Sequence, residues 1–108
     1  MYAVIGQVKI KPDRSEGTLA MIRDHGTAML QGMAGSQGGY WARTVDSGDL
    51  IQHSFWLFDT EDNARSAETT FTTLREIPEA PAVFVSVDVC EVVGEGCSKS
   101  VEALPRRK

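Results

Sequence analysis

The chain has two cysteines among 108 residues, and no stretch approaches the roughly 20 apolar residues that a membrane-spanning helix needs. Cys90 and Cys97 are too few for a disulfide scaffold, and they lack the spacing and the accompanying histidines of a zinc site. The first residues also lack the basic and apolar segments of a secretory signal. These absences predict a cytoplasmic protein that binds no metal and no membrane.

Glycine-rich motifs that bind nucleotides are absent as well. The glycines at positions 32, 35, 38 and 39 match neither the dinucleotide nor the P-loop pattern, and they follow a predicted helix rather than a strand. No nucleophile elbow and no spaced cluster of His, Asp and Glu is present. We therefore expect no nucleotide, no metal and no other cofactor.

Positive charge is scarce in the body of the chain. Residues 1–98 contain seven Lys and Arg against fourteen Asp and Glu, whereas residues 99–108 contain four basic side chains and one acidic. An acidic body argues against binding nucleic acid, which needs a basic stripe. The length and the composition, 42% hydrophobic and 24% charged, fit one globular domain over residues 1–94. Residues 95–108 are expected to form a polar, flexible tail.

Hydrophobic periodicity predicts six elements of secondary structure. Alternation with period two is typical of strands, and apolar residues at helical spacing are typical of amphipathic helices. Asp46-Ser47-Gly48-Asp49 is predicted to be a hairpin turn, and the prolines at 78 and 81 mark a loop. In chain order we expect a strand over 2–10, a helix from a cap within 12–15 to about 33, strands over 38–45 and 50–58, a helix from a cap within 59–62 to about 76, and a strand over 83–93.

This order predicts an α+β domain with the ferredoxin-like split βαββαβ fold: a four-stranded antiparallel sheet with two helices on one face. The strands carry apolar residues on both faces, with Val4, Val8, Trp56 and Phe58 on one and Ile5, Ile51, Phe55 and Leu57 on the other. Two short helices cover only one face, and an exposed apolar face of that size is an aggregation hazard. We therefore predict a homodimer in which two sheets pack face to face.

Two runs of residues carry a resemblance to a known family. Gly35-Ser36-Gln37-Gly38-Gly39-Tyr40 follows the first helix, and Phe58-Asp59-Thr60-Glu61-Asp62-Asn63-Ala64 joins the third strand to the second helix. Together with the element order, these runs resemble the antibiotic biosynthesis monooxygenase family of the dimeric α/β-barrel superfamily. The resemblance implies a dimeric α/β barrel and a cofactor-free oxidation of a small aromatic or quinone-type substrate by O2.

Other members of that family degrade haem, and the chain departs from them at two places. Their first-strand Asn corresponds to Gly6 here, and their haem-ligating His has no counterpart among residues 63–76. Haem degradation by their mechanism is therefore not expected. Family members also commonly end the third strand with Trp, where this chain has Phe58 and carries Trp56 two residues earlier on the same face.

The sharpest candidate site lies on the strand face shared by Ser54, Trp56 and Phe58. With Gly6 on the first strand, these residues are predicted to form a flat apolar slot with one hydroxyl, in which Gly6 leaves room for a substrate ring. The alternative is plain core packing, in which Gly6 accommodates the Trp56 ring.

His25 is the candidate for proton transfer, and we assign catalysis to His25 and Trp56. In a helix of 100° per residue, His25 lies about 60° from Ile22 of the apolar stripe, so it is expected to reach a pocket between helix and sheet. Histidine exchanges protons near neutral pH, as the deprotonation of a phenol requires. Its position also resembles one where family members carry a polar pocket residue. The alternative is a partly solvated histidine at the boundary of the core.

Further candidates lie on the remaining strand positions. Tyr40 and Trp41 are expected on opposite faces of an edge strand, so at least one of them should lie at the dimer contact or at a pocket rim, and Tyr40 is the one assigned to substrate binding. His53 is a weaker candidate for a site role. Asp88 is a candidate base if it is desolvated; the alternative is an Asp88 that faces solvent or is paired, with Arg43 as its candidate partner.

Two functions follow from these observations. The first is a cofactor-independent monooxygenase, in which a small aromatic ligand binds in an apolar pocket and loses a proton before it reacts with O2. The second is a non-catalytic dimeric ligand-binding or accessory protein, which uses the same pocket without an acid or a base. The resemblance favours the first, and the lack of a strong polar cluster favours the second.

Overall fold

A four-stranded antiparallel sheet forms the centre of the computed structural model, which describes residues 1–45, 50–73 and 82–96. β1 (Tyr2–Ile10) is a central strand between β3 (Ile51–Phe58) and β4 (Ala82–Glu91), and β2 (Ser36–Arg43) is the edge strand beside β3. All three strand pairs are antiparallel. The predicted ferredoxin-like βαββαβ fold is therefore confirmed, whereas the dimer stays a prediction.

The first helical segment has three parts that the sequence did not separate. After a short 3-10 turn at Pro12–Arg14 come α1 (Ser15–Met21), a π-helical turn (Ile22–Gly26) and α2 (Thr27–Gly32). The N–H of Thr27 donates to the carbonyl of Ile22, five residues earlier, which is the bond that defines a π turn. The predicted single helix to residue 33 is thus nearly correct in extent, but its middle is wider than an α-helix.

The second helix, α3 (Glu61–Thr72), begins at the predicted cap. The Asn63 backbone N–H donates to the Thr60 hydroxyl at 3.2 Å, which pairs one of the free N–H groups at the helix start. The predicted helix end near residue 76 lies outside the described residues, as do the turn at 46–49, the loop around residues 78 and 81, Cys97, and the tail from residue 97.

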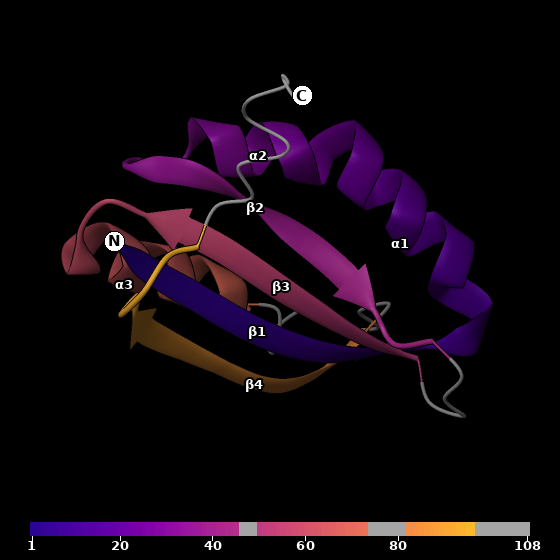
Figure 1. Cartoon of the computed structure of the whole chain (residues 1–108). Helices are drawn as coiled ribbons and strands as arrows, with labels where there is room; N and C mark the ends of the chain where they lie inside the picture. Colours follow the sequence, from indigo (N-terminus) through magenta and orange to yellow (C-terminus); the bar gives the residue numbers. More distant parts are fainter. Residues whose placement is uncertain (46–49, 74–81, 97–108) are drawn as a thin grey trace, which may run out of the picture.

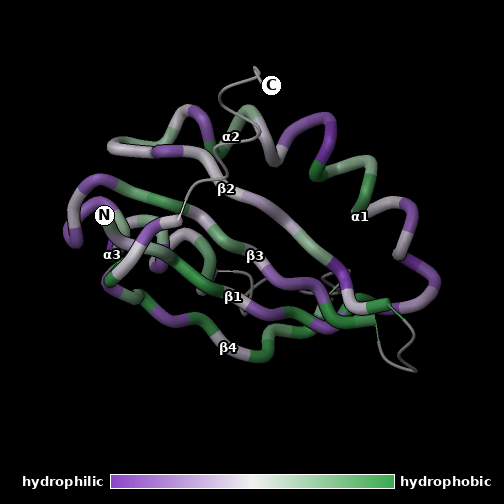
Figure 2. The backbone as a smooth tube through the Cα atoms, viewed as in Figure 1, coloured by the Kyte–Doolittle hydropathy of each residue, from purple (hydrophilic) through white to green (hydrophobic). Residues whose placement is uncertain are grey.

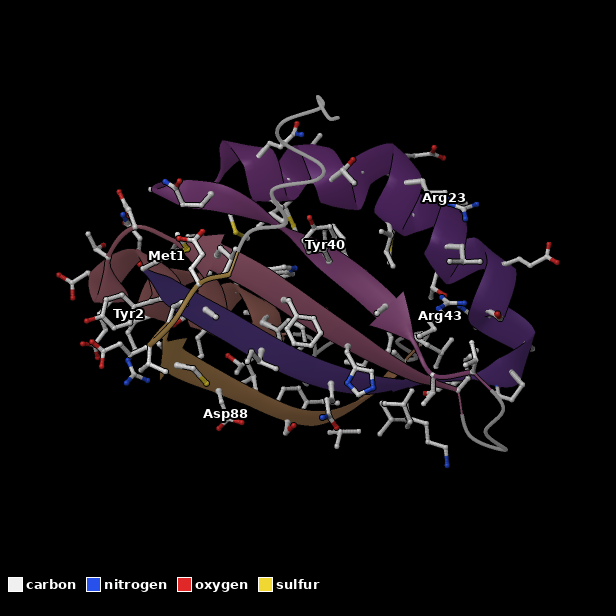
Figure 3. The ribbon with its side chains drawn as sticks, in the orientation of Figure 1. Met1, Tyr2, Arg23, Tyr40, Arg43 and Asp88 are labelled. Carbon is white, nitrogen blue, oxygen red and sulfur yellow. The ribbon has the colours of Figure 1, made fainter. Side chains whose placement is uncertain are left out.

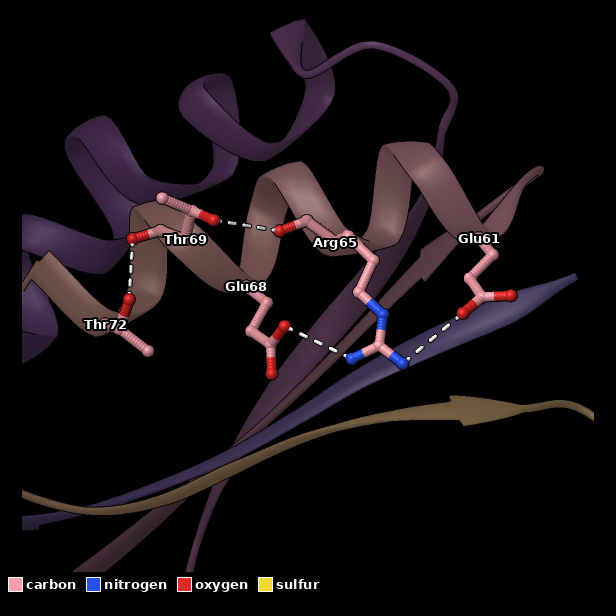
Figure 4. A network of polar contacts seen from close by, with 5 residues as sticks. All are labelled: Glu61, Arg65, Glu68, Thr69 and Thr72. Carbon is pink, nitrogen blue, oxygen red and sulfur yellow. Dashed lines mark hydrogen bonds and ion pairs between the residues drawn. The ribbon is translucent and has the colours of Figure 1, made fainter.

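The exposed side of α3 carries a small polar network (Figure 4). Arg65 pairs with Glu61 at 3.3 Å and with Glu68 at 3.4 Å, and its hydrogen bonds with the two carboxylates raise the pKa of its guanidinium. The hydroxyls of Thr69 and Thr72 donate to helix carbonyls of Arg65 and Thr69. Because these groups are solvated, the network contributes little to stability, and packing of the opposite side holds α3 in place.

Both helical segments lie on one face of the sheet, and the other face is left open by the described residues (Figure 1). Apolar segments follow β1, β3 and β4 (Figure 2), but the buried core forms only on the covered face. Its members come from the alternate positions of β1 and β3 and from one side of each helix: Val4, Val8, Ile10, Leu30, Trp56, Phe58, Ala64, Ala67 and Phe71. The open face is the one that the sequence predicts to meet a second copy.

The turn from α2 to β2 depends on Gly35, which has φ +73°. Its carbonyl accepts the Asp59 N–H at 3.0 Å, and a Cβ at this position would overlap the side chains of Asp59 and Asn63. We expect Gly35→Ala to lower the free energy of unfolding by about 2 kcal/mol, because it adds left-handed strain to this overlap. Urea unfolding measures the change. Gly32→Ala, which meets no atom within 4 Å, should leave stability equal or slightly higher, and a similar loss in both variants would contradict this account.

Candidate functional site

A cavity of about 370 Å³ lies between the first helical segment, the end of α3 and the covered face of the sheet. Its helix wall includes the π turn, with Ile22, His25 and Gly26, and the methionines at positions 21 and 29. The π turn matters here because it shifts the side chains after Ile22 relative to a regular helix. Gly26 lies close to the sheet, and a Cβ there would be in ordinary van der Waals contact with the Trp41 ring, at 3.6 Å.

His25 lines this cavity, as predicted, but its side chain is also exposed to solvent. His25 thus combines the two alternatives, a pocket residue and a partly solvated histidine, because it lies at the rim of the cavity and is in contact with water. Met21 and Met29 flank it and are 49% and 44% exposed. Among the described lining residues His25 is the only histidine, and none is Asp, Glu, Lys, Arg or Cys.

The sheet wall is built by alternate residues of β3. Gln52, Ser54 and Trp56 all face the cavity, and Trp41 extends this wall on β2. Ser54 and Trp56 were predicted as site residues from this alternation, and the structure brings them together with His25. Gln52 was missed, although it lies two residues before Ser54 on the same face.

The space above Gly6 is occupied by Phe71 of α3. A Cβ on Gly6 would lie 2.7 Å from Phe71 Cε2, so the glycine lets the ring pack directly on the backbone of β1. Phe71 in turn makes edge contacts with Trp56, at 5.6 Å between ring centroids, and with Phe84, at 5.9 Å. Gly6 therefore accommodates a ring of the protein rather than lining the cavity, and that ring is Phe71, not Trp56.

Two other predicted binding residues lie away from the cavity. Phe58 has no exposed surface and belongs to the core. Tyr40 is 74% exposed and pairs with Phe55 on the open face, where Figure 3 shows it on β2. Neither is among the cavity-lining residues. The neighbouring Trp41 is the aromatic residue of β2 that lines the cavity.

Arg43 does not pair with Asp88, contrary to expectation. Asp88 belongs to β4 and Arg43 to β2, which are opposite edges of the sheet (Figure 3). Asp88 is exposed and lies beside Ile5 in the ladder of the open face, and His53 lies on that face too. The solvent-facing interpretation of Asp88 is therefore the one that the structure supports.

Arg43 instead joins β2 to β3 and to the start of α1. Its Nε donates to Gln52 Oε1 at 3.1 Å, its Nη1 to the Ser15 hydroxyl at 3.1 Å, and its Nη2 to the Thr18 hydroxyl at 2.6 Å. Burial, and then the nearby Arg23, lower the pKa of Arg43. Figure 3 shows Arg43 between the end of β2 and the first helix.

Two polar groups of the sheet wall have no protein partner among the described residues. The indole Nε1 of Trp56 is buried without a hydrogen bond, and no hydrogen bond is made by the Ser54 hydroxyl, although Ser54 is 3% exposed. Buried polar groups are normally paired, so this wall is built for more than apolar packing. Within the described residues, no cluster of three or more His, Cys, Asp or Glu could hold a metal ion, and no helix is long and apolar enough to cross a membrane.

The fold of the chain is shared with small α+β proteins of known structure. A putative antibiotic biosynthesis monooxygenase from Deinococcus radiodurans has a TM-score of 0.67 at 9% identity, over 91% of this chain and 97% of that one. A second putative antibiotic biosynthesis monooxygenase, from Chloroflexus aurantiacus, has a TM-score of 0.58 at 14% identity, over 88% of this chain and 96% of that one.

The Mycobacterium tuberculosis protein Rv0793 is also similar, with a TM-score of 0.56 at 17% identity, over 89% of this chain and 98% of that one. No family model and no curated protein sequence matches the chain. The predicted resemblance to the antibiotic biosynthesis monooxygenases is thus confirmed at the level of the fold.

Proposed function

We propose that the chain is a cofactor-independent monooxygenase that oxidises a small aromatic or quinone-forming substrate with O2. The observation that carries this proposal is the cavity: its walls are mostly apolar and aromatic, with a few polar groups of β3 and one histidine at the rim. Such a site fits a flat ring and orients it with few hydrogen bonds. The fold shared with the putative monooxygenases supports the same reaction class.

In the proposed reaction, a ring methylene is converted to a carbonyl. His25 accepts a proton from the bound substrate, and the resulting anion supplies electrons to O2. One oxygen atom enters the product and the other leaves as water with the two hydrogens of the methylene group. The substrate provides all four electrons, and no other reductant is required. Trp56 contributes a flat surface on which the ring packs.

The test is oxygen uptake with anthrones, which carry a ring methylene, measured together with the absorbance of the quinone product. We expect His25→Ala to lower kcat by about 10²- to 10⁴-fold, the usual contribution of a positioned proton acceptor. Added imidazole should restore part of the rate, because His25 is accessible from solvent. The matched control is His53→Ala, which removes the other histidine of the chain, on the open face, and should retain activity.

The position of His25 favours a second function, that of a non-catalytic ligand-binding or accessory protein. His25 is the only described lining residue suited to proton transfer near neutral pH, and it lies at the solvated rim rather than deep in the cavity. A ligand-binding or accessory protein needs no such group. Aromatic ligands that bind without any oxygen uptake would support this function and contradict the monooxygenase.

We also propose that the open face of the sheet is covered by a second copy of the chain. The face combines apolar side chains from all four strands: Ile5, Tyr40, Ile51, Phe55, Leu57 and Val83. Phe55 is 41% exposed and Val83 is 53% exposed, and a sheet face that exposes several large apolar residues is typical of a contact surface. A two-fold axis through the face would bring the same residues of both copies together.

A further inference from the structure

We propose that the Gln52 amide, held by Arg43, and the Ser54 hydroxyl form an oxygen-binding end of the cavity that selects aromatic ligands with a carbonyl or phenolate oxygen. This inference deepens the proposed function and rests on it. It assigns the substrate a recognisable group and an orientation, and it gives Arg43 the role of a positioning residue.

The contact with Arg43 fixes the direction of the Gln52 amide. A guanidinium has donors only, so the Gln52 atom that meets Arg43 Nε at 3.1 Å must be the carbonyl oxygen Oε1. The NH2 group of Gln52 then points away from Arg43, and it has no partner among the described residues. Gln52 is 8% exposed and lines the cavity. Its two N–H donors are therefore the part of the side chain that remains for a ligand.

Arg43 is itself held firmly enough to act in this way. Besides Gln52, it donates to the Ser15 carbonyl at 3.3 Å, to the Ser15 hydroxyl and to the Thr18 hydroxyl. No carboxylate pairs with it in the part of the chain that the structure describes. The guanidinium charge lies beside the Gln52 amide, so this end of the cavity favours an oxygen that carries negative charge.

Ser54 adds a second group beside Gln52. It lies two residues along β3 on the same face, about 7 Å away in an extended strand. Ser54 is buried at the cavity wall, and its hydroxyl has no partner among the described residues. The described lining residues contain no Asp, Glu, Lys or Arg. An oxygen on an aromatic ring can accept from this hydroxyl while the ring packs against Trp56 and Phe71, which also line the cavity.

Hydrogen bonds to an ionised oxygen are stronger than those to a neutral one. The Gln52 donors consequently stabilise the phenolate form of a bound phenol more than the phenol itself. In the oxidation proposed above, the anion is the form that gives electrons to O2. The same groups would thus bind the substrate and lower the cost of its deprotonation.

The experiment uses 4-nitrophenol, whose phenol and phenolate forms differ in absorbance, and measures the pKa of the bound probe by spectral titration. In the wild-type chain we expect this pKa to fall by about one unit, a tenfold preference for the phenolate. Gln52→Glu keeps the shape and the contact with Arg43 but replaces both donors with a carboxylate, so the bound pKa should rise above that of the free probe. Arg43→Lys keeps the charge but loses the fork of donors, so it should lose most of the shift.

Thr70→Val is the matched control. Thr70 also lines the cavity, but its hydroxyl donates to the Ser66 carbonyl of its own helix, so its loss should not move the bound pKa. A wild-type pKa equal to that of the free probe, or a shift that survives in Gln52→Glu, would overturn the inference.

A binding measurement with toluene distinguishes failure of this inference from failure of the proposed function. If toluene binds and the probe shows no preference for phenolate, the aromatic cavity stands and the oxygen-binding end is wrong. If neither toluene nor 4-nitrophenol binds, both proposals are wrong.

Discussion

Gly6→Ala is expected to lower the free energy of unfolding by about 2–3 kcal/mol, although it adds only one methyl group. The added Cβ would lie 2.7 and 2.8 Å from two atoms of the Phe71 ring. Phe71 is 5% exposed and in edge contact with Trp56 and Phe84, so its ring can move away from β1 only at the expense of these contacts. Urea or thermal unfolding measures the loss, which corresponds to a fall in Tm of roughly 10–20 °C for a domain of this size.

A double-mutant cycle tests the cause. Phe71→Ala alone should cost about 3–5 kcal/mol, because it removes a buried ring. In the double variant Gly6→Ala/Phe71→Ala, the alanine at position 6 meets no ring, so the total loss should be smaller than the sum of the two by about 1–2 kcal/mol. Additive losses would contradict the contact. Gly17→Ala, in an exposed helical position with no atom within 4 Å, is the control and should stabilise slightly.

The face on which Gly6 lies could be predicted from the sequence, but its contact with Phe71 could not. Alternation along β1 and β3 correctly placed Gly6, Ser54 and Trp56 on one face, because side chains of a strand have a strict period of two. The helical spacing of apolar residues predicted the second helix. It gave no means of knowing which strand residue Phe71 meets, since that depends on how the helix crosses the sheet.

Two other features of the cavity had no signal in a single sequence. The π turn at Ile22–Gly26 inserts one extra residue into a helix whose apolar residues still fit a regular stripe. Arg43 was paired with Asp88 on charge alone, whereas the order of the strands places the two at opposite edges. Gln52 could have been predicted, because it lies on the same face of its strand as Ser54. It was missed because glutamine on a strand is not a typical catalytic residue.

Phe55→Glu is expected to convert the predicted dimer into a monomer. Phe55 lies on β3, a central strand of the open face, between Ile5 of β1 and Tyr40 of β2. A two-fold axis places both copies of the new carboxylate in one interface, where burial of an unpaired charge costs several kcal/mol. We expect the dimer Kd to rise by more than about a hundredfold, which corresponds to roughly 3 kcal/mol. Light scattering at micromolar concentration measures the change.

Ala28→Glu is the matched control for this experiment. It adds the same charge at an exposed position of α2, in the layer on the other side of the sheet, and it should leave the dimer intact. A wild-type chain that is monomeric at micromolar concentration, or a Phe55→Glu variant that stays dimeric, would contradict the face-to-face arrangement.

The Phe55→Glu monomer also separates assembly from ligand binding, because β3 serves both faces at once. Odd-numbered residues such as Phe55 point to the open face, whereas Gln52, Ser54 and Trp56 point into the cavity. Every described residue that lines the cavity belongs to one chain, on the side of the sheet opposite the proposed dimer contact. We therefore expect the folded monomer to bind toluene as tightly as the wild type does. Loss of binding in a monomer that remains folded would mean that the second copy shapes the cavity through β3.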